Sequence, residues 1–454
     1  MTSPPRANAG SFTGNVLGML ATQGLTFPLQ IATGIMTARF LGPHDRGLYS
    51  LLLMIPQTLE VLLKLGVAPA NIYMICREKV KSRHIVSNSV LLAFGLGAMA
   101  FLVLPFRDIL DETILANVDG WYLTLAVSIV PLYILSAYLT SILQALNQFA
   151  TANRQTIIVA GYRVVATFVV LVVLQKGLFE AFLVNVGGSA LGAGCLLASV
   201  LAVTSASFRP NVAVAATTVR FGLKSHAQAL LTAFHLRLDH FLIAFFLGPS
   251  EVAFYAIATH IAEMVADIHR PISVVLYPHL ASTSEIHIHH TTVTVCRHVL
   301  FLELIAGVGV VLASNLVIVV LYGRAYLPAL PPLFILMPGV LTLSLFNLLA
   351  KSFASRNKQQ TTIVAGLAGL VVNTLLNILM IPPLGIRGAA LASTVSYSLA
   401  AAILLVAFRR DSGISALELI RIRKTDVEFY QKLVVGLIAR PRTARFVPGA
   451  TSQS

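Results

Sequence analysis

Apolar residues run along most of this chain in long stretches that are separated by short polar segments. Twelve stretches approach or exceed the roughly 20 residues that a helix needs to cross a hydrocarbon core about 30 Å thick. We expect transmembrane helices at 15–38, 48–70, 86–106, 121–145, 155–174, 180–203, 222–246, 252–276, 298–322, 329–349, 361–381 and 386–408. The segments between them are too short for a soluble domain, so the pattern predicts an all-α integral membrane protein.

Polar residues interrupt four of these stretches, and they recur every three or four positions. This spacing places them on one face of each helix. A charge at the bilayer centre costs about 2.5 to 3.5 kcal/mol, so these faces avoid lipid. The polar faces comprise Thr22, Thr26, Gln30, Thr33 and Thr37 in the first span, Gln57, Glu60, Lys64 and Asn71 in the second, Gln228, Thr232, His235 and Asp239 in the seventh, and His260, Glu263, Asp267 and Arg270 in the eighth.

The polar faces fit two interpretations. Glu60 precedes Lys64 by four residues, the favourable order for an ion pair on one helix. A closed salt-bridge core between helices is therefore one interpretation. The other is a hydrated cavity between the two halves of the chain. We expect Arg237 to point away from the polar face of its own helix and, unless a kink turns it, to pair with a neighbour such as Glu303 instead of contacting a ligand. Arg163 either reaches the cytoplasmic edge of the membrane or lines the cavity.

The chain contains an internal repeat. The segment ARFLGPHDRGLYSLLL at 38–53 returns as AFFLGPSEVAFYAIA at 244–258, and QTIIVAG at 155–161 returns as QTTIVAG at 360–366. The offset equals six spans, so both halves share one orientation, which predicts two parallel six-helix lobes. The domains expected are a leader (1–14), an N-terminal lobe (15–205), a linker (206–221), a C-terminal lobe (222–408) and a basic tail (409–454).

Charge is scarce but unevenly placed. Only 11% of residues are charged, against about 25% in soluble domains, and the net charge is +14. The cations gather in alternate loops and in the tail, as the positive-inside rule requires, and the loop after the third span is acidic. This distribution predicts a cytoplasmic membrane protein with both termini inside, a tail held at anionic lipids, and no nucleic-acid partner.

Neither the cysteines nor the histidine-rich run of the chain indicates a metal site. The three cysteines, Cys76, Cys195 and Cys296, lack metal-ligand spacing. The run EIHIHH at 285–290 resembles a metal tract only in composition, and we interpret it as a solvated cytoplasmic loop.

Taken with the twelve spans in two lobes, the segments RFLGPHDRGLY at 39–49 and LGIRGAALAS at 384–393 resemble the oligosaccharide flippase branch of the multidrug, oligosaccharidyl-lipid and polysaccharide exporter superfamily. The resemblance implies a central V-shaped cavity lined by the first, second, seventh and eighth spans. It also implies alternating-access transport of a polyprenyl-diphosphate-linked sugar to the outer leaflet. The first lobe departs from the pattern, because its counterpart of the GIRGAA segment, near 179–184, lacks the glycines.

The resemblance implies functional roles for the residues of the polar faces. A diphosphate needs cations, which makes Lys64 and Arg270 the first candidates for substrate contact, and Glu60 and Asp267 are candidates to hold these cations or a coupling ion. The full set of candidates is Lys64, Arg270, Gln30, Gln57, His235 and His260 for substrate binding, and Glu60, Asp239, Glu263 and Asp267 as counterions or ion-coupling groups.

We therefore expect a lipid-linked sugar flippase with no cofactor and with coupling to H⁺ or Na⁺. Its partners would be the lipid-linked sugar, membrane lipids and a polysaccharide polymerase machinery. A multidrug exporter of the same superfamily is the main alternative. A membrane enzyme acting on lipid-linked sugars is less favoured, because the chain has no Walker A lysine loop and no H-E-x-x-H motif.

Overall fold

The structure, a computed structural model, describes residues 9–113, 120–204, 208–269, 272, 276, 285–356 and 358–421. All the regular elements of this part of the chain are helices, which confirms the all-α fold. Eight helical segments are long and apolar enough to cross a membrane, and they match the third to sixth and the ninth to twelfth predicted spans. A bent pair, Gly18–Leu63 with Val67–Cys76, adds a ninth. The predicted number of twelve is therefore not confirmed within the described residues.

The first half of the chain forms one group of helices. Its elements are α1 (Ala9–Leu63), α2 (Val67–Cys76), α3 (Ser82–Met99), η1 (Ala100–Phe106), α4 (Arg107–Thr113), α5 (Gly120–Ser128), α6 (Val130–Ala145), α7 (Phe149–Thr167), η2 (Phe168–Val173) and α8 (Leu178–Thr204). The long α1 contains both the first and the second predicted span.

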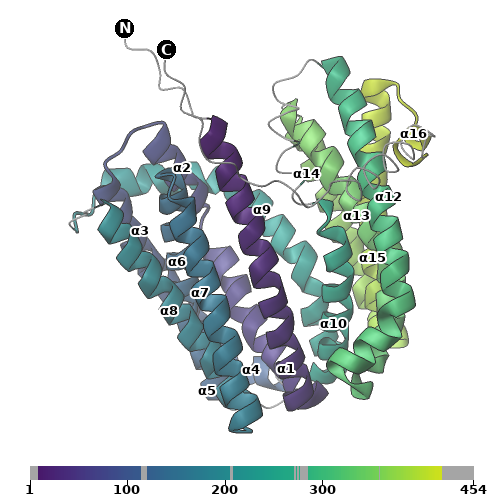
Figure 1. Cartoon of the computed structure of the whole chain (residues 1–454), viewed down its shortest axis with the longest axis horizontal. Helices are drawn as coiled ribbons and strands as arrows, with labels where there is room; N and C mark the ends of the chain where they lie inside the picture. The colour runs from purple at the N-terminus through teal and green to yellow at the C-terminus, as the bar shows by residue number, and fades with distance from the viewer. Residues whose placement is uncertain are drawn as a thin grey trace, which may run out of the picture.

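The second half forms the other group. Its elements are α9 (Val212–Leu247), α10 (Pro249–Ala266), α12 (Glu285–Val317), η3 (Ile318–Tyr322), η4 (Arg324–Ala329), α13 (Leu330–Ser355), α14 (Gln359–Leu384), α15 (Ile386–Ser412) and α16 (Ala416–Ile420). In Figure 1 the two groups lie side by side, with α1 and α9 between them. The first turns of α1 and the short α16 lie at the same end of the bundle (Figure 1).

The two Gly-Pro turns of the repeat have the same backbone conformation. Gly42 interrupts α1 with φ 75° and ψ 173°, and Gly248 separates α9 from α10 with φ 91° and ψ 177°. These angles belong to a region that essentially only glycine occupies. The sequence repeat is therefore also a structural repeat, and each glycine sits where its turn requires it.

The histidine-rich run at 285–290 is helical, and its interpretation as a loop is wrong. It forms the first turns of α12. Ile288 is buried together with Val293, Cys296 and Val299, so the apolar spacing of the helix begins in the run itself. Burial of this face explains why the segment continues the helix instead of ending it.

Helix α9 begins at Val212, inside the segment expected to be a linker, and its first half packs on the N-terminal group. Asn88 donates to the Asn211 carbonyl and accepts from its N–H, both at 2.9 Å. Phe221 stacks on Tyr73 with ring centroids 4.2 Å apart. A Cβ on Gly222 would lie 2.5 Å from the Leu65 carbonyl oxygen, so the backbones of the two groups approach closely here. Helix α9 thus belongs to both groups.

Candidate functional site

The predicted ion pair on α1 is present. Lys64 Nζ lies 3.2 Å from Glu60 Oε1, and the two side chains are 25% and 16% exposed. Neither charge is sealed in a closed core. Such an i,i+4 pair contributes only about 0.3 to 0.5 kcal/mol to stability, so stability alone gives little reason to place these charges in a membrane.

Arg237 of α9 faces this pair, and its predicted pairing with Glu303 is wrong. Its Nη2 donates to Gln57 Oε1 at 3.2 Å, and the guanidinium interacts electrostatically with Glu60. Its Nη1 is buried and has no hydrogen-bond partner among the described residues. The reason is the position of α9 between the two groups, because the face opposite its predicted polar face meets α1. We call Gln57, Glu60, Lys64 and Arg237 the inter-lobe cluster.

Asp239 lies two residues further on and points into the C-terminal group instead. It is buried, and it accepts hydrogen bonds from Tyr255 Oη at 2.7 Å, from Ser393 Oγ at 3.3 Å and from the His240 backbone N–H at 3.0 Å. His240 Nδ1 also lies 3.1 Å from Asp239 Oδ1. These hydrogen bonds offset the free-energy cost of burying the carboxylate in the protein interior.

Two asparagines of α14 extend the polar network around Asp239. Asn373 donates to the hydroxyls of Ser393 and Ser396, both at 3.3 Å, and Asn377 donates to Asn373 Oδ1 at 3.0 Å. The Oδ1 of Asn377 is buried and lacks a hydrogen-bond donor within the described residues. We call Asp239, Asn373, Asn377 and Ser393 the buried oxygen cluster.

The other predicted candidates scatter. Gln30 of α1 and His260 of α10 are exposed, while Glu263 and the more C-terminal Asp267 are half-buried. The side chain of His235 lies outside the described residues, and so does all of Arg270. The predicted pairing of Lys64 with Arg270 across the lobes therefore stays a prediction. The threonine hydroxyls of the first polar face donate to carbonyls of their own helix.

Two other charged residues that the sequence singled out make local pairs. Glu303, expected to meet Arg237, lies with its Oε1 3.7 Å from His269 Nδ1. Arg163 donates to Asn185 Oδ1 at 3.1 Å and so pairs with a neighbouring helix of its own group. Neither residue belongs to the inter-lobe cluster.

The two groups of helices are joined at the end that carries the Gly-Pro turns. Arg39 Nε donates to the Leu321 carbonyl at 2.8 Å, and its Nη2 donates to the Val320 carbonyl. Tyr326 donates to the Ala38 carbonyl at 2.8 Å. These contacts fasten the end of the first α1 segment to η3 and η4 of the other group.

Sequence reasoning set Arg237 aside as a residue paired with a neighbour, and it missed the asparagines of the buried oxygen cluster. A signal for the asparagines existed, because Asn373 and Asn377 are one helical turn apart in an otherwise apolar span. Arg237 gave no such signal, since its role depends on α9 packing against the opposite group.

Comparison with known proteins agrees with the fold. The chain is similar in structure to an inward-facing multidrug resistance MATE family transporter of the MOP superfamily (TM-score 0.69, 14% identity, 88% of this chain and 98% of the other). It is also similar to the lipid II flippase MurJ in an inward closed conformation (TM-score 0.66, 15% identity, 93% and 96%). A third match is a MOP superfamily transporter from Pyrococcus furiosus described as having a binding pocket of reverse polarity (TM-score 0.60, 14% identity, 89% and 95%).

A search of curated protein sequences finds no match. Residues 12–284 match the family described as "Polysaccharide biosynthesis protein", which is more than half of the chain. The match covers the first Gly-Pro turn, the inter-lobe cluster and the second turn. The chain therefore belongs to the polysaccharide biosynthesis protein family, with the fold of the MOP superfamily transporters.

Proposed function

We propose that this protein is a flippase that carries a polyprenyl-diphosphate-linked oligosaccharide or polysaccharide repeat unit across the cytoplasmic membrane, for export of a surface polysaccharide. The observation that carries the proposal is the inter-lobe cluster. Lys64 and Arg237 bring two cations together from opposite halves, and one guanidinium nitrogen lacks a partner within the described part of the chain. A half-buried cation with a buried, unpartnered donor atom favours an anionic ligand.

The chemistry of the substrate explains why cations are useful there. A diphosphate cannot enter hydrocarbon without losing the hydration of several charges, which is prohibitively costly. A cavity that offers Lys64, Arg237 and the predicted Arg270 replaces part of that hydration. Glu60 would hold the cations while the site is empty and would release them to the diphosphate.

Alternating access supplies the movement. The contacts of Arg39 and Tyr326 fasten the two groups at the Gly-Pro end, which faces outward if both termini are cytoplasmic. We infer a resting state that is closed to the outside. Transport then requires these contacts to break while the site opens to the outer leaflet.

A coupling ion would occupy the buried oxygen cluster. Asp239 supplies a carboxylate and Asn377 an unpartnered amide oxygen, and both carry lone pairs that suit Na⁺, while Asp239 alone suits H⁺. Because this cluster lies on α9, α14 and α15, ion binding would change how α9 packs on the C-terminal group and thereby the contacts between the lobes. A multidrug exporter is less favoured, since cationic drugs would meet Lys64 and Arg237.

The proposal is tested in proteoliposomes that contain the full chain and a fluorescent polyprenyl-diphosphate saccharide. We measure how fast label that starts in the inner leaflet becomes accessible to a membrane-impermeant quencher outside the liposome. Arg237→Gln and Lys64→Gln should each slow flipping strongly, while Arg107→Gln, which removes an exposed arginine paired with Asp108, should not. Equal rates in empty liposomes and in liposomes with the wild-type protein would reject the flippase function. Efflux of a cationic dye with no sugar transport would favour the multidrug exporter.

A further inference from the structure

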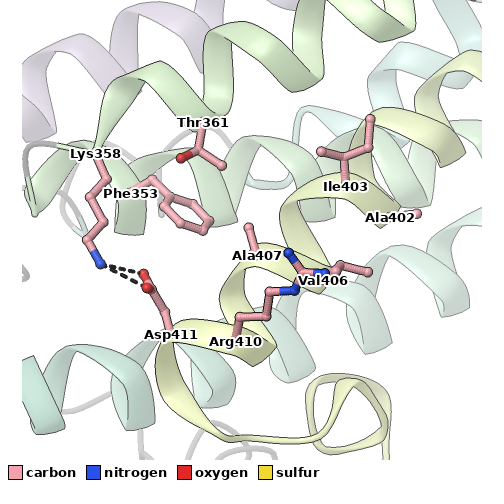
Figure 2. A pocket seen from close by; sticks show the side chains of 9 residues that line it. All are labelled: Phe353, Lys358, Thr361, Ala402, Ile403, Val406, Ala407, Arg410 and Asp411. Carbon is pink, nitrogen blue, oxygen red and sulfur yellow. Dashed lines mark hydrogen bonds and ion pairs between the residues drawn. The ribbon is translucent and has the colours of Figure 1, made fainter.

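A pocket of about 530 Å³ opens at the end of the C-terminal group, away from the inter-lobe cluster. It lies between the last turn of α13, the start of α14 and the final turns of α15, as Figure 2 shows. Phe353, Ile403 and Val406 contribute to its apolar wall, and Lys358, Arg410 and Asp411 form a charged rim. Nothing in the proposed transport path uses this pocket.

One face of α15 builds most of the wall. The lining positions 402, 403, 406, 407 and 410 recur at helical spacing, so their side chains share a face. The first four are apolar and the last is Arg410, which makes the groove apolar along its length and cationic at its end. Val406 is 52% exposed, so the apolar surface is not covered by the rest of the described chain.

The rim carries more positive than negative charge. Asp411 accepts from Arg356 Nη1 at 2.8 Å and from Lys358 Nζ at 2.8 and 2.9 Å. Arg356 is buried and lies over the Phe353 ring, so it holds Asp411 in place. Lys358 is 45% exposed, and the side chain of Arg410 makes no hydrogen bond or ion pair within the described residues. Asp411 is therefore already paired with Arg356 and Lys358, and the lining of the pocket holds two cations, Lys358 and Arg410, against this one carboxylate (Figure 2).

We propose that this pocket binds an anionic phospholipid of the cytoplasmic leaflet. The lipid phosphate would lie between Lys358 and Arg410, with Thr361 as a further donor, and an acyl chain would follow Ile403 and Val406. Basic pockets between transmembrane helices at this membrane face favour anionic headgroups. The pocket lies where the apolar spans of α13, α14 and α15 end, and lipid headgroups begin where such spans end.

Net charge distinguishes an anionic phospholipid from two other possible occupants of the pocket, a zwitterionic lipid and the chain's own C-terminal residues. A zwitterionic lipid offers no net charge to balance the rim. The chain's own residues 422–454 contain six Lys and Arg against two Asp and Glu, so they carry the same sign as the pocket. The inference is independent of the flippase proposal, because it requires only a bilayer that contains anionic phospholipid.

Native mass spectrometry of the purified full chain tests the inference. Phosphatidylglycerol is titrated against phosphatidylcholine, and the dissociation constant of the tightest bound lipid is measured. Lys358→Gln and Arg410→Gln should each weaken phosphatidylglycerol binding about fivefold, the change that corresponds to about 1 kcal/mol per cation near an anionic lipid. Asp411→Asn should tighten binding, because it removes the competing anion.

Two controls decide between this pocket and general surface charge. Arg409→Gln neutralises an exposed neighbour of Arg410 that does not line the pocket, and its binding should match the wild type. Val406→Trp fills the apolar groove without changing charge, and it should weaken binding as well. Equal losses in the Arg409 and Arg410 variants, or wild-type binding by Val406→Trp, would overturn the inference. So would selective displacement of phosphatidylglycerol by a polyprenyl diphosphate, which would assign the pocket to the transported lipid.

Discussion

Gly47, in the first Gly-Pro hairpin, packs directly on Pro249 of the second. A Cβ added at Gly47 would lie 1.8 Å from the Pro249 carbonyl oxygen. The two hairpins are the matching elements of the repeat, so the halves meet through equivalent segments. The same end holds the Arg39 and Tyr326 contacts, and any opening there must separate Gly47 from Pro249.

Gly47→Ala should therefore destabilise the closed end. Its added methyl meets backbone atoms that cannot rotate away, and such overpacking costs about 1 to 3 kcal/mol. We expect a shift toward the outward-open state, measured as faster thiol labelling of a cysteine placed at Gln57 from the outer side. Gly34→Ala on the same helix is the control, because nothing lies within 4 Å of its added Cβ. Unchanged labelling in Gly47→Ala would show that this contact does not hold the closed state.

The hydrogen bonds of Arg39 and Tyr326 allow a gentler test of the same closure. Tyr326→Phe removes only the hydroxyl that donates to Ala38, and Arg39→Gln removes the guanidinium from the η3 carbonyls. Each loss should cost about 0.5 to 1.5 kcal/mol, or up to about 3 for the charged group. The rate of labelling from the outer side should be higher in Tyr326→Phe than in the wild type, and higher again in Arg39→Gln. If both variants label more slowly than the wild type, these bonds do not belong to the closed state.

Substitution of Lys64 tests whether the polar faces form a transport site or only a salt-bridge core. If the Glu60 pair were structural only, Lys64→Ala would lower the melting temperature and leave flipping by the inserted protein intact. We expect the reverse, because an i,i+4 pair contributes only about 0.3 to 0.5 kcal/mol. Lys64→Glu and Arg270→Glu should abolish flipping, and Arg270→Lys should retain part of it. Full transport by a stable Lys64→Ala, Arg270→Ala double variant would return both residues to the salt-bridge interpretation.

Local patterns predicted much of the fold. Gly42 and Gly248 could be identified as turns because each precedes a proline at the end of an apolar stretch in both copies of the repeat, and the Glu60–Lys64 pair followed from spacing on one helix. Arg237 could not be placed in this way. Its direction depends on α9 lying between two groups of helices, which is a tertiary relationship that helical periodicity does not contain. Asp239 illustrates the same limit, since its face is polar but turns toward α14 and α15.

Asp239 leads to the last prediction, which concerns the coupling ion. Asp239→Asn keeps the size of the side chain but removes the charge that a cation or proton would neutralise. Flipping should then become slow and independent of the ion gradient. In the wild type, Na⁺ at 100 times its dissociation constant would raise the free energy of unfolding by about 2.7 kcal/mol, which is measured as a higher melting temperature. Asp239→Asn should abolish this gain.

Asn377→Leu separates the two ions. It removes the unpartnered amide oxygen of the buried oxygen cluster but leaves the Asp239 carboxylate in place. If Na⁺ is the coupling ion, the variant loses the stabilisation by Na⁺, with K⁺ as the reference salt. If a proton is the coupling ion, the variant keeps its dependence on the pH gradient, because protonation needs only the carboxylate. Gradient-dependent flipping at the wild-type rate in Asp239→Asn would exclude this cluster from coupling altogether. The ion would then have to act on one of the other acidic candidates, Glu60, Glu263 or Asp267.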